Sequence, residues 1–164
     1  YADAPILCHL SGHIHMQHIA KSDSGLCDIA TSSLAVSPNQ YGVLTCSADT
    51  LSYRTESVDV ASWAASRGCQ NADLLHFAEY SAAFFRNTCI RQALDVIQED
   101  EAPEQLADFF ADVNAAYFAG RMDRCPIDAQ LAARWQRQAG FLARYIESIV
   151  QEPPQNACEW TSGE

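Results

Sequence analysis

The stretch LSYRTESVDVASWAASRG, residues 51–68, decides the fold because the hydrophobic period changes within it. Its first half alternates as a strand does, whereas its second half carries small and apolar residues at helical spacing. Asp59 is suited to cap the N-terminus of this helix, and Gly68 to end it. The sequence therefore predicts an α+β protein, with a β part up to residue 58 and a helical part after it.

Short apolar or alternating runs separated by turn residues fill the β part, and they predict four or five strands. YGVLTCS and LSYRTESV flank ADT as an expected hairpin. The other expected strands are PILCHL, IHMQHI and CDIATSSLAV. So short a β segment rarely folds by itself. These strands are therefore interpreted as the last part of a larger sheet.

Helical periodicity continues to the end of the chain. A short helix over 59–68 precedes a long one over 73–98. Pro103 and Gly120 bracket a third helix, since proline favours the first helical position and glycine the residue after the last. A fourth helix is expected over 128–151, ended by Pro153 and Pro154.

Composition limits the kinds of partner. The formal net charge is −11 and Lys21 is the only lysine. Such a surface repels polyanions, so binding along a nucleic-acid backbone is not expected. A local metal cluster could still draw in a small phosphorylated substrate, because bound divalent ions override the surrounding charge. No apolar run is long enough to cross a bilayer. The seven cysteines contain no CxxC pair, and both free thiols and one or two disulfides fit them.

The segment HLSGHIHMQH, residues 9–18, holds four of the five histidines. Residues two apart on a strand point the same way, about 6.6 Å apart along it. His13 and His15 could therefore converge on a metal ion, and two half-buried strand histidines with backbone partners are the structural alternative.

LSGHIHMQHI resembles the last signature motif of the calcineurin-like metallophosphoesterases, Gly-His-x-His at the end of a core strand. DIATSSLAVSPNQYGVL, AEYSAAFFRNTC and VNAAYFAGRMD look like the region after that motif and the helical extension of a bacterial branch. The resemblance implies the final strands of a calcineurin-like α/β sandwich over residues 1–58 and a helical C-terminal extension over 59–164. Members of this branch often carry export signals, which favours an extracytoplasmic location.

The same resemblance implies two divalent metal ions (manganese, iron or zinc), with His13 a ligand of one and His15 of the other. A metal-activated hydroxide would hydrolyse a phosphate mono- or diester. The other ligand motifs of that family do not occur between Tyr1 and Glu164. The missing N-terminal part of the same protein would then supply them, this part alone would be inactive, and the helical half could form an oligomer.

Three further residues are candidates for substrate contact. His18 follows the motif, and Asn39 and Tyr41 lie in a loop that could return to the site. Turn chemistry alone also explains that loop. Two other functions stay open: a non-enzymatic helical module whose histidine-rich N-terminus binds metal, and a disulfide-bonded interaction domain.

Overall fold

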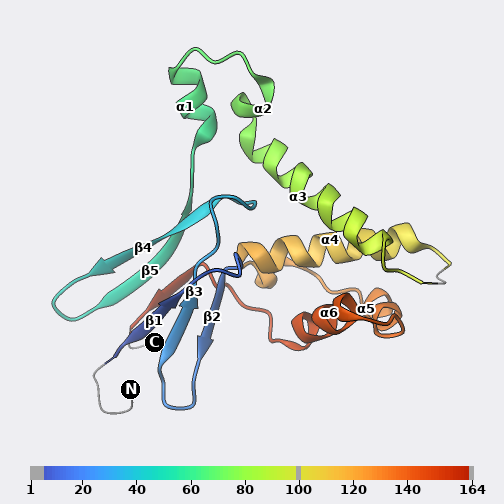
Figure 1. The fold of residues 1–164 in the computed structure, drawn as a ribbon. Helices are drawn as coiled ribbons and strands as arrows, with labels where there is room; N and C mark the ends of the chain where they lie inside the picture. The colour runs from blue at the N-terminus through green and yellow to red at the C-terminus, as the bar shows by residue number, and fades with distance from the viewer. Residues whose placement is uncertain (1–5, 99–100, 163–164) are drawn as a thin grey trace.

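The computed structural model describes residues 6–98 and 101–162 and has an α+β fold. Two small three-stranded sheets are formed mainly by the first part of the chain, helices follow, and a last strand returns to the second sheet (Figure 1). The acidic run QEDEAPE, residues 98–104, lies partly outside the described residues. No calcineurin-like sandwich is present among these elements, so only the coarser α+β expectation is confirmed.

The first sheet has the strand order β1-β3-β2. Its strands are β1 (Cys8–Ser11), β2 (His18–Lys21) and β3 (Cys27–Ala30). β1 and β3 are parallel, whereas β2 and β3 are antiparallel. The carboxyl ends of β1 and β3 therefore lie at the same edge of the sheet.

The second sheet has the order β4-β5-β6 and is antiparallel throughout. β4 (Gln40–Cys46) and β5 (Leu51–Ser57) form the expected hairpin. The third strand, β6 (Glu159–Thr161), was not predicted, because a three-residue strand carries too little periodicity to be recognised.

A small apolar cluster joins the two sheets. Ile19, Cys27 and Ile29 contribute from the first sheet, and Tyr53 from the second. Ala157, just before β6, completes the cluster. The chain thus brings its C-terminal segment back against the strands with which it starts.

The first helices follow β5 directly. α1 (Val60–Ser66) begins at Asp59, whose carboxylate accepts from the backbone N–H of Ser62 at 2.9 Å, as expected for an N-cap. The expected long helix is divided into α2 (Ala72–Leu75) and α3 (Phe77–Leu94). α1, α2 and the start of α3 extend away from the sheets (Figure 1).

Of the remaining helices, α4 (Pro103–Ala119) packs against α3, and α5 (Ala129–Gln136) and α6 (Phe141–Gln151) pack against α4. α4 begins at the proline and ends at Gly120 as predicted, with Gly120 at φ 70°. A 3₁₀ turn, η1 (Met122–Arg124), leads into the rest of the chain. The expected fourth helix is two helices, α5 and α6, because Gly140 adopts φ 97° between them.

The main hydrophobic core lies among α3, α4, α5 and α6. Its largest fully buried side chains are Trp135 and Phe110. The indole Nε1–H of Trp135 donates to the carbonyl of Leu106 at 2.9 Å, so the one polar atom of that ring is satisfied.

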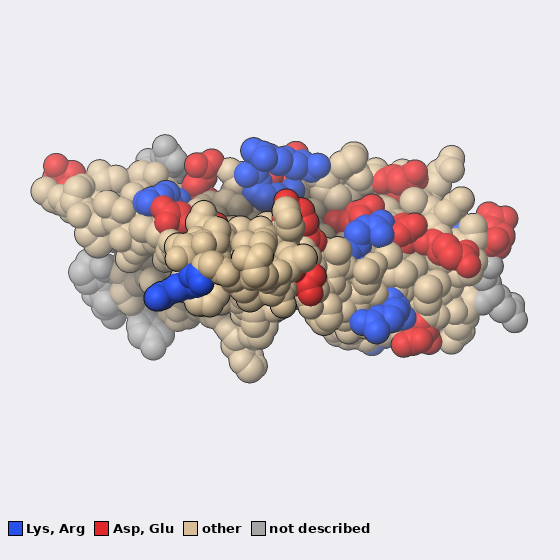
Figure 2. Space-filling view, turned by 90° about the horizontal axis from the view of Figure 1, so that it is seen from above, with Lys and Arg blue, Asp and Glu red and all other residues tan. Residues whose placement is uncertain are grey.

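Two surface properties complete the description. Seen from above, acidic side chains occupy both ends of the visible face, with basic ones among them (Figure 2). Within the described ranges, no helix is both long and apolar enough to span a bilayer.

Candidate functional site

Residues 12–16, here called the histidine turn, follow β1 at the carboxyl end of the parallel β1-β3 pair. His13 and His15 both have positive φ, 77° and 61°. Non-glycine residues in this region cost about 1–3 kcal/mol each, and such strain is concentrated at functional sites. The ends of parallel strands are also where α/β sheets commonly bind ligands.

The expected strand over 14–19 is therefore wrong at its start. Strand backbone needs negative φ, so the positive φ of His13 and His15 ends β1 and delays β2 until His18. Both histidines are exposed, and the alternation argument that placed their rings on one strand face does not apply. The turn is instead held on one side by Ser32, whose Oγ donates to the carbonyl of His15 at 3.4 Å.

Gln17 fixes the end of the histidine turn from inside the protein. Only 1% of its surface is exposed. Its Nε2 donates to the carbonyl of Ala157 at 2.8 Å, and its Oε1 accepts from the Tyr53 hydroxyl at 3.0 Å and from Ser32 N–H at 3.3 Å. Its backbone N–H donates to the carbonyl of Phe118 at 3.2 Å. One buried residue thus ties the turn to both sheets through its side chain and to α4 through its backbone.

The side chain of Gln17 is packed so closely that its neighbour Gly120 has no space for a side chain. A Cβ at Gly120 would lie 2.6 Å from the Gln17 Cγ, so only glycine allows α4 to end this close. Tyr53 also lies 3.1 Å, hydroxyl to Oγ1, from Thr31 at the end of β3. Burial raises the pKa of Tyr53, which keeps its hydroxyl protonated as a donor.

His18, the first residue of β2, faces the segment after α6. Its Nε2 lies 3.0 Å from Glu152 Oε2 and 3.3 Å from Gln155 Nε2. The Tyr117 hydroxyl donates to the other Glu152 oxygen at 3.4 Å. Burial, reinforced by Glu152, raises the pKa of Tyr117 to about 12. His18 is thus already engaged in a junction between sheet and helices.

Asn39 and Tyr41 lie on either side of the start of β4. Asn39 is 6% exposed at φ 55°, and its Nδ2 donates to the carbonyl of Leu34 at 2.9 Å. The Tyr41 hydroxyl donates to Glu56 across the hairpin at 2.8 Å. Among the residues that the structure describes, neither side chain forms a hydrogen bond with the histidine turn.

A second cluster of polar side chains lies on one face of the first sheet, and the sequence does not predict that these side chains come together. Asp28 accepts from the Ser11 hydroxyl at 2.9 Å and lies 3.4 Å from His9 Nδ1. His9 and Asp28 also line a cavity of about 540 Å³ near the β2-β3 hairpin, at the opposite end of β1 from the histidine turn. The parallel register that aligns His9 with Asp28 cannot be read from either run alone.

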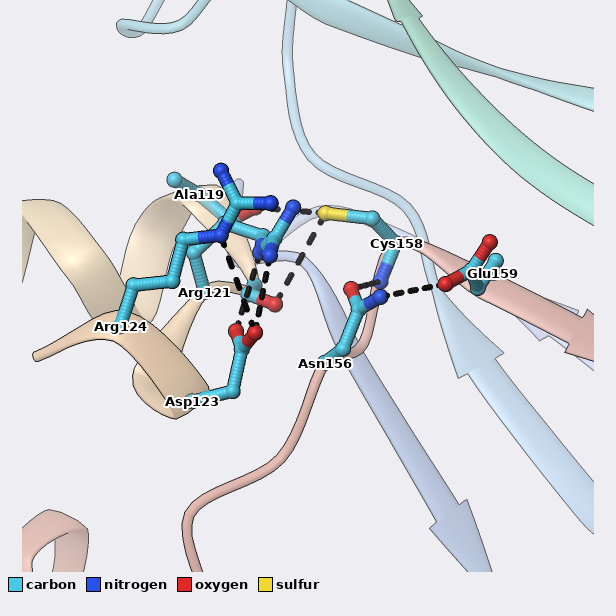
Figure 3. Close-up of polar contacts among 8 residues, drawn as sticks. Ala119, Arg121, Asp123, Arg124, Asn156, Cys158 and Glu159 are labelled. Atoms are coloured by element: carbon cyan, nitrogen blue, oxygen red, sulfur yellow. Dashed lines mark hydrogen bonds and ion pairs between the residues drawn. The ribbon is translucent and has the colours of Figure 1, made fainter.

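The end of α4 is joined to the C-terminal segment by polar contacts (Figure 3). The Cys158 thiol donates to the carbonyl of Ala119 at 3.1 Å, and its backbone N–H donates to Asn156 Oδ1 at 3.0 Å. Arg121 forms a two-point ion pair with Asp123, at 3.0 and 2.8 Å. The bond from Cys158 to Ala119, and that from the Ala157 N–H to the carbonyl of Gly120 at 2.8 Å, hold Ala157 where Gln17 reaches it.

The predicted dinuclear metal centre is wrong. No group of three or more histidine, cysteine or acidic side chains that could hold a metal ion occurs among the described residues. His13 and His15 lack the further ligands that two divalent ions would need. The predicted manganese, iron or zinc cofactors are wrong for the same reason, and so is the alternative of a module that binds metal through its histidine-rich N-terminus.

Comparison with known proteins supports another family. A family model described as the C-terminal domain of cyclic nucleotide phosphodiesterase matches residues 59–156, more than half of the chain. No curated protein matches. The predicted membership of the calcineurin-like metallophosphoesterases, with its metal-dependent function, is corrected by this match. The chain belongs to the family of the C-terminal domain of cyclic nucleotide phosphodiesterase.

Proposed function

We propose that this protein is a phosphodiesterase that hydrolyses a cyclic nucleotide, with the histidine turn in contact with the phosphodiester group. The family description supplies the substrate class. The observation that carries the site assignment is the pair of exposed histidines held at positive φ at the carboxyl end of two parallel strands.

Imidazole side chains can carry out the two proton transfers that phosphodiester hydrolysis needs. Hydrolysis of a cyclic phosphodiester adds water across one P–O bond, so one proton leaves the attacking water and one reaches the departing oxygen. We assign these two transfers to His13 and His15, one ring as base and the other as acid. Imidazole changes charge near neutral pH, which makes both roles available to the same residue type.

Local positive charge is also needed to bind an anion to this protein. The net charge is −11, so the surface as a whole repels a phosphodiester. A protonated imidazole donates a charge-assisted hydrogen bond to a phosphoryl oxygen, and such bonds are about twice as strong as neutral ones.

We further propose a division of labour at residue 58. The family match begins at residue 59, which supports a boundary between a β part over 1–58 and a helical part over 59–164. In this proposal the β part presents the histidines, and the helical part fixes their position through the contact of Phe118 with Gln17.

His18, Asn39 and Tyr41 remain proposed substrate contacts. Each side chain already has a protein partner: Glu152, Leu34 and Glu56 respectively. Substrate would have to replace those partners. Of the three, His18 is closest in sequence to the turn.

Hydrolysis of 3′,5′-cyclic AMP to the 5′-monophosphate tests the proposal. Asparagine at His13 or His15 should lower kcat about 10²–10⁴-fold, the usual contribution of a general acid or base. His76→Asn is the matched control, because His76 is exposed and lies between α2 and α3, away from the sheets (Figure 1). Turnover within twofold of the original protein in both variants, or no turnover by the original protein, would contradict the assignment.

A further inference from the structure

Two cysteines lie side by side in the first sheet, one of them in β1, the strand that leads into the histidine turn. Cys8 in β1 and Cys27 in β3 are direct partners in the parallel register. Neighbouring strands lie about 4.8 Å apart, within the Cα separation of about 4.4–6.8 Å that a disulfide spans. Partners in register also project from the same face of the sheet. Both thiols are free in this structure.

We propose that Cys8 and Cys27 form a reversible disulfide, and that this bond controls the position of the histidine turn. Cys8 is half-buried, whereas Cys27 is only 1% exposed, so Cys8 is the thiol that an oxidant meets first. Both belong to the cluster between the sheets, with Ile29 and Tyr53 around them. The proposed control of activity, unlike the bond itself, rests on the proposed function.

The oxidant is a small-molecule disulfide such as oxidised glutathione. The Cys8 thiolate attacks one of its sulfurs and releases one glutathione thiolate. The Cys27 thiolate then attacks the Cys8 sulfur of the mixed disulfide and releases the second. The two cysteines lose two electrons and two protons in all, and one oxidised glutathione becomes two reduced molecules.

The surroundings set the pH dependence of this reaction. Burial, with a smaller effect of nearby Cys46, raises the pKa of Cys8, and burial followed by Cys8 raises that of Cys27. Asp28 raises the pKa of Cys27 further, while Lys21 opposes this. Since only thiolates attack, bond formation accelerates as pH rises above neutral.

Bond formation would also tie β1 covalently to β3. The usual strand spacing of about 4.8 Å already lies within the Cα separation that a disulfide spans, so the bond adds a covalent link without changing the strand pairing. β1 has only four residues, and the histidine turn follows it at once. The covalent link therefore restrains the start of residues 12–16, which is how the bond controls the histidine turn.

Peptide mapping tests the bond. The full chain is treated with oxidised glutathione at pH 8.5, alkylated, and cut before aspartate, which places Cys8, Cys27 and Cys46 on the separate peptides 3–22, 23–27 and 28–48. A link between 3–22 and 23–27, lost in Cys27→Ser and reversed by dithiothreitol, is expected. Cys89→Ser is the matched control, because Cys89 is also 1% exposed but lies in the helical core.

Each other result overturns a definite part of the inference. Alkylation of both Cys8 and Cys27, or a link from Cys8 to Cys46, would refute the proposed pair. A correct link with unchanged cyclic AMP turnover would refute control of the turn while leaving the phosphodiesterase assignment intact. Turnover absent in both redox states would contradict the proposed function and leave the bond established.

Discussion

Gln17→Ala should destabilise the protein far more than an ordinary glutamine substitution. The side chain makes three hydrogen bonds, to Ala157, Tyr53 and Ser32. At a net value of about 1 kcal/mol each, their loss costs about 3 kcal/mol, before any cost of leaving partners unsatisfied. The expected fall in melting temperature is roughly 6–12 °C, at about 2–4 °C per kcal/mol for a chain of this size.

Gln40→Ala is the matched control for that experiment. Gln40 is 4% exposed, but its side chain makes one hydrogen bond, from Nε2 to the carbonyl of Ala119 at 3.4 Å. The same atoms are removed, so the expected loss is about 1 kcal/mol plus a similar cavity cost. Urea unfolding measures both variants. Losses that agree within about 0.5 kcal/mol would refute the claim that Gln17 joins the halves of the protein.

Two further predictions concern the same junction. Gly120→Ala should destabilise the protein by at least about 1 kcal/mol more than Gly68→Ala, since both glycines have positive φ but only at Gly120 would the new Cβ meet the fixed Gln17 side chain. Equal unfolding free energies of the two variants would argue against the close approach. Because the folded-state pKa of Tyr117 is raised to about 12, its contribution to stability is full below pH 10 and is lost as pH rises from 10 to 12, at most about 2.7 kcal/mol. Tyr117→Phe should therefore lose less stability over that range in thermal melts, and identical slopes would count against the raised pKa.

Elements with strong local signals could be predicted from the sequence. The β4-β5 hairpin, the Asp59 cap and the limits of α4 depend on residues adjacent to one another, and the structure confirms them. The division of the last helix could have been suspected from Gly140. The break at His76 carries no such signal, because histidine is an ordinary helix residue.

The candidate site was less accessible to sequence analysis. The spacing of His13 and His15 was visible, but the backbone that makes it a turn is held by Gln17, whose partners lie as far along the chain as Ala157. Gln17 has no motif, and its importance follows only from burial and from three distant partners. The pairing of Cys8 with Cys27 depends on the strand register in the same way.

The most direct test of the account is to follow the histidine ring protons by NMR while 3′,5′-cyclic AMP is added to the full chain. Five histidines give five assignable signals, identified by single substitutions. The account predicts that the signals of His13 and His15 shift together with one saturation curve, while that of His76 stays unchanged. A shift that spares His13 and His15, or no shift at concentrations that support turnover, would contradict the claim that the histidine turn binds the phosphodiester.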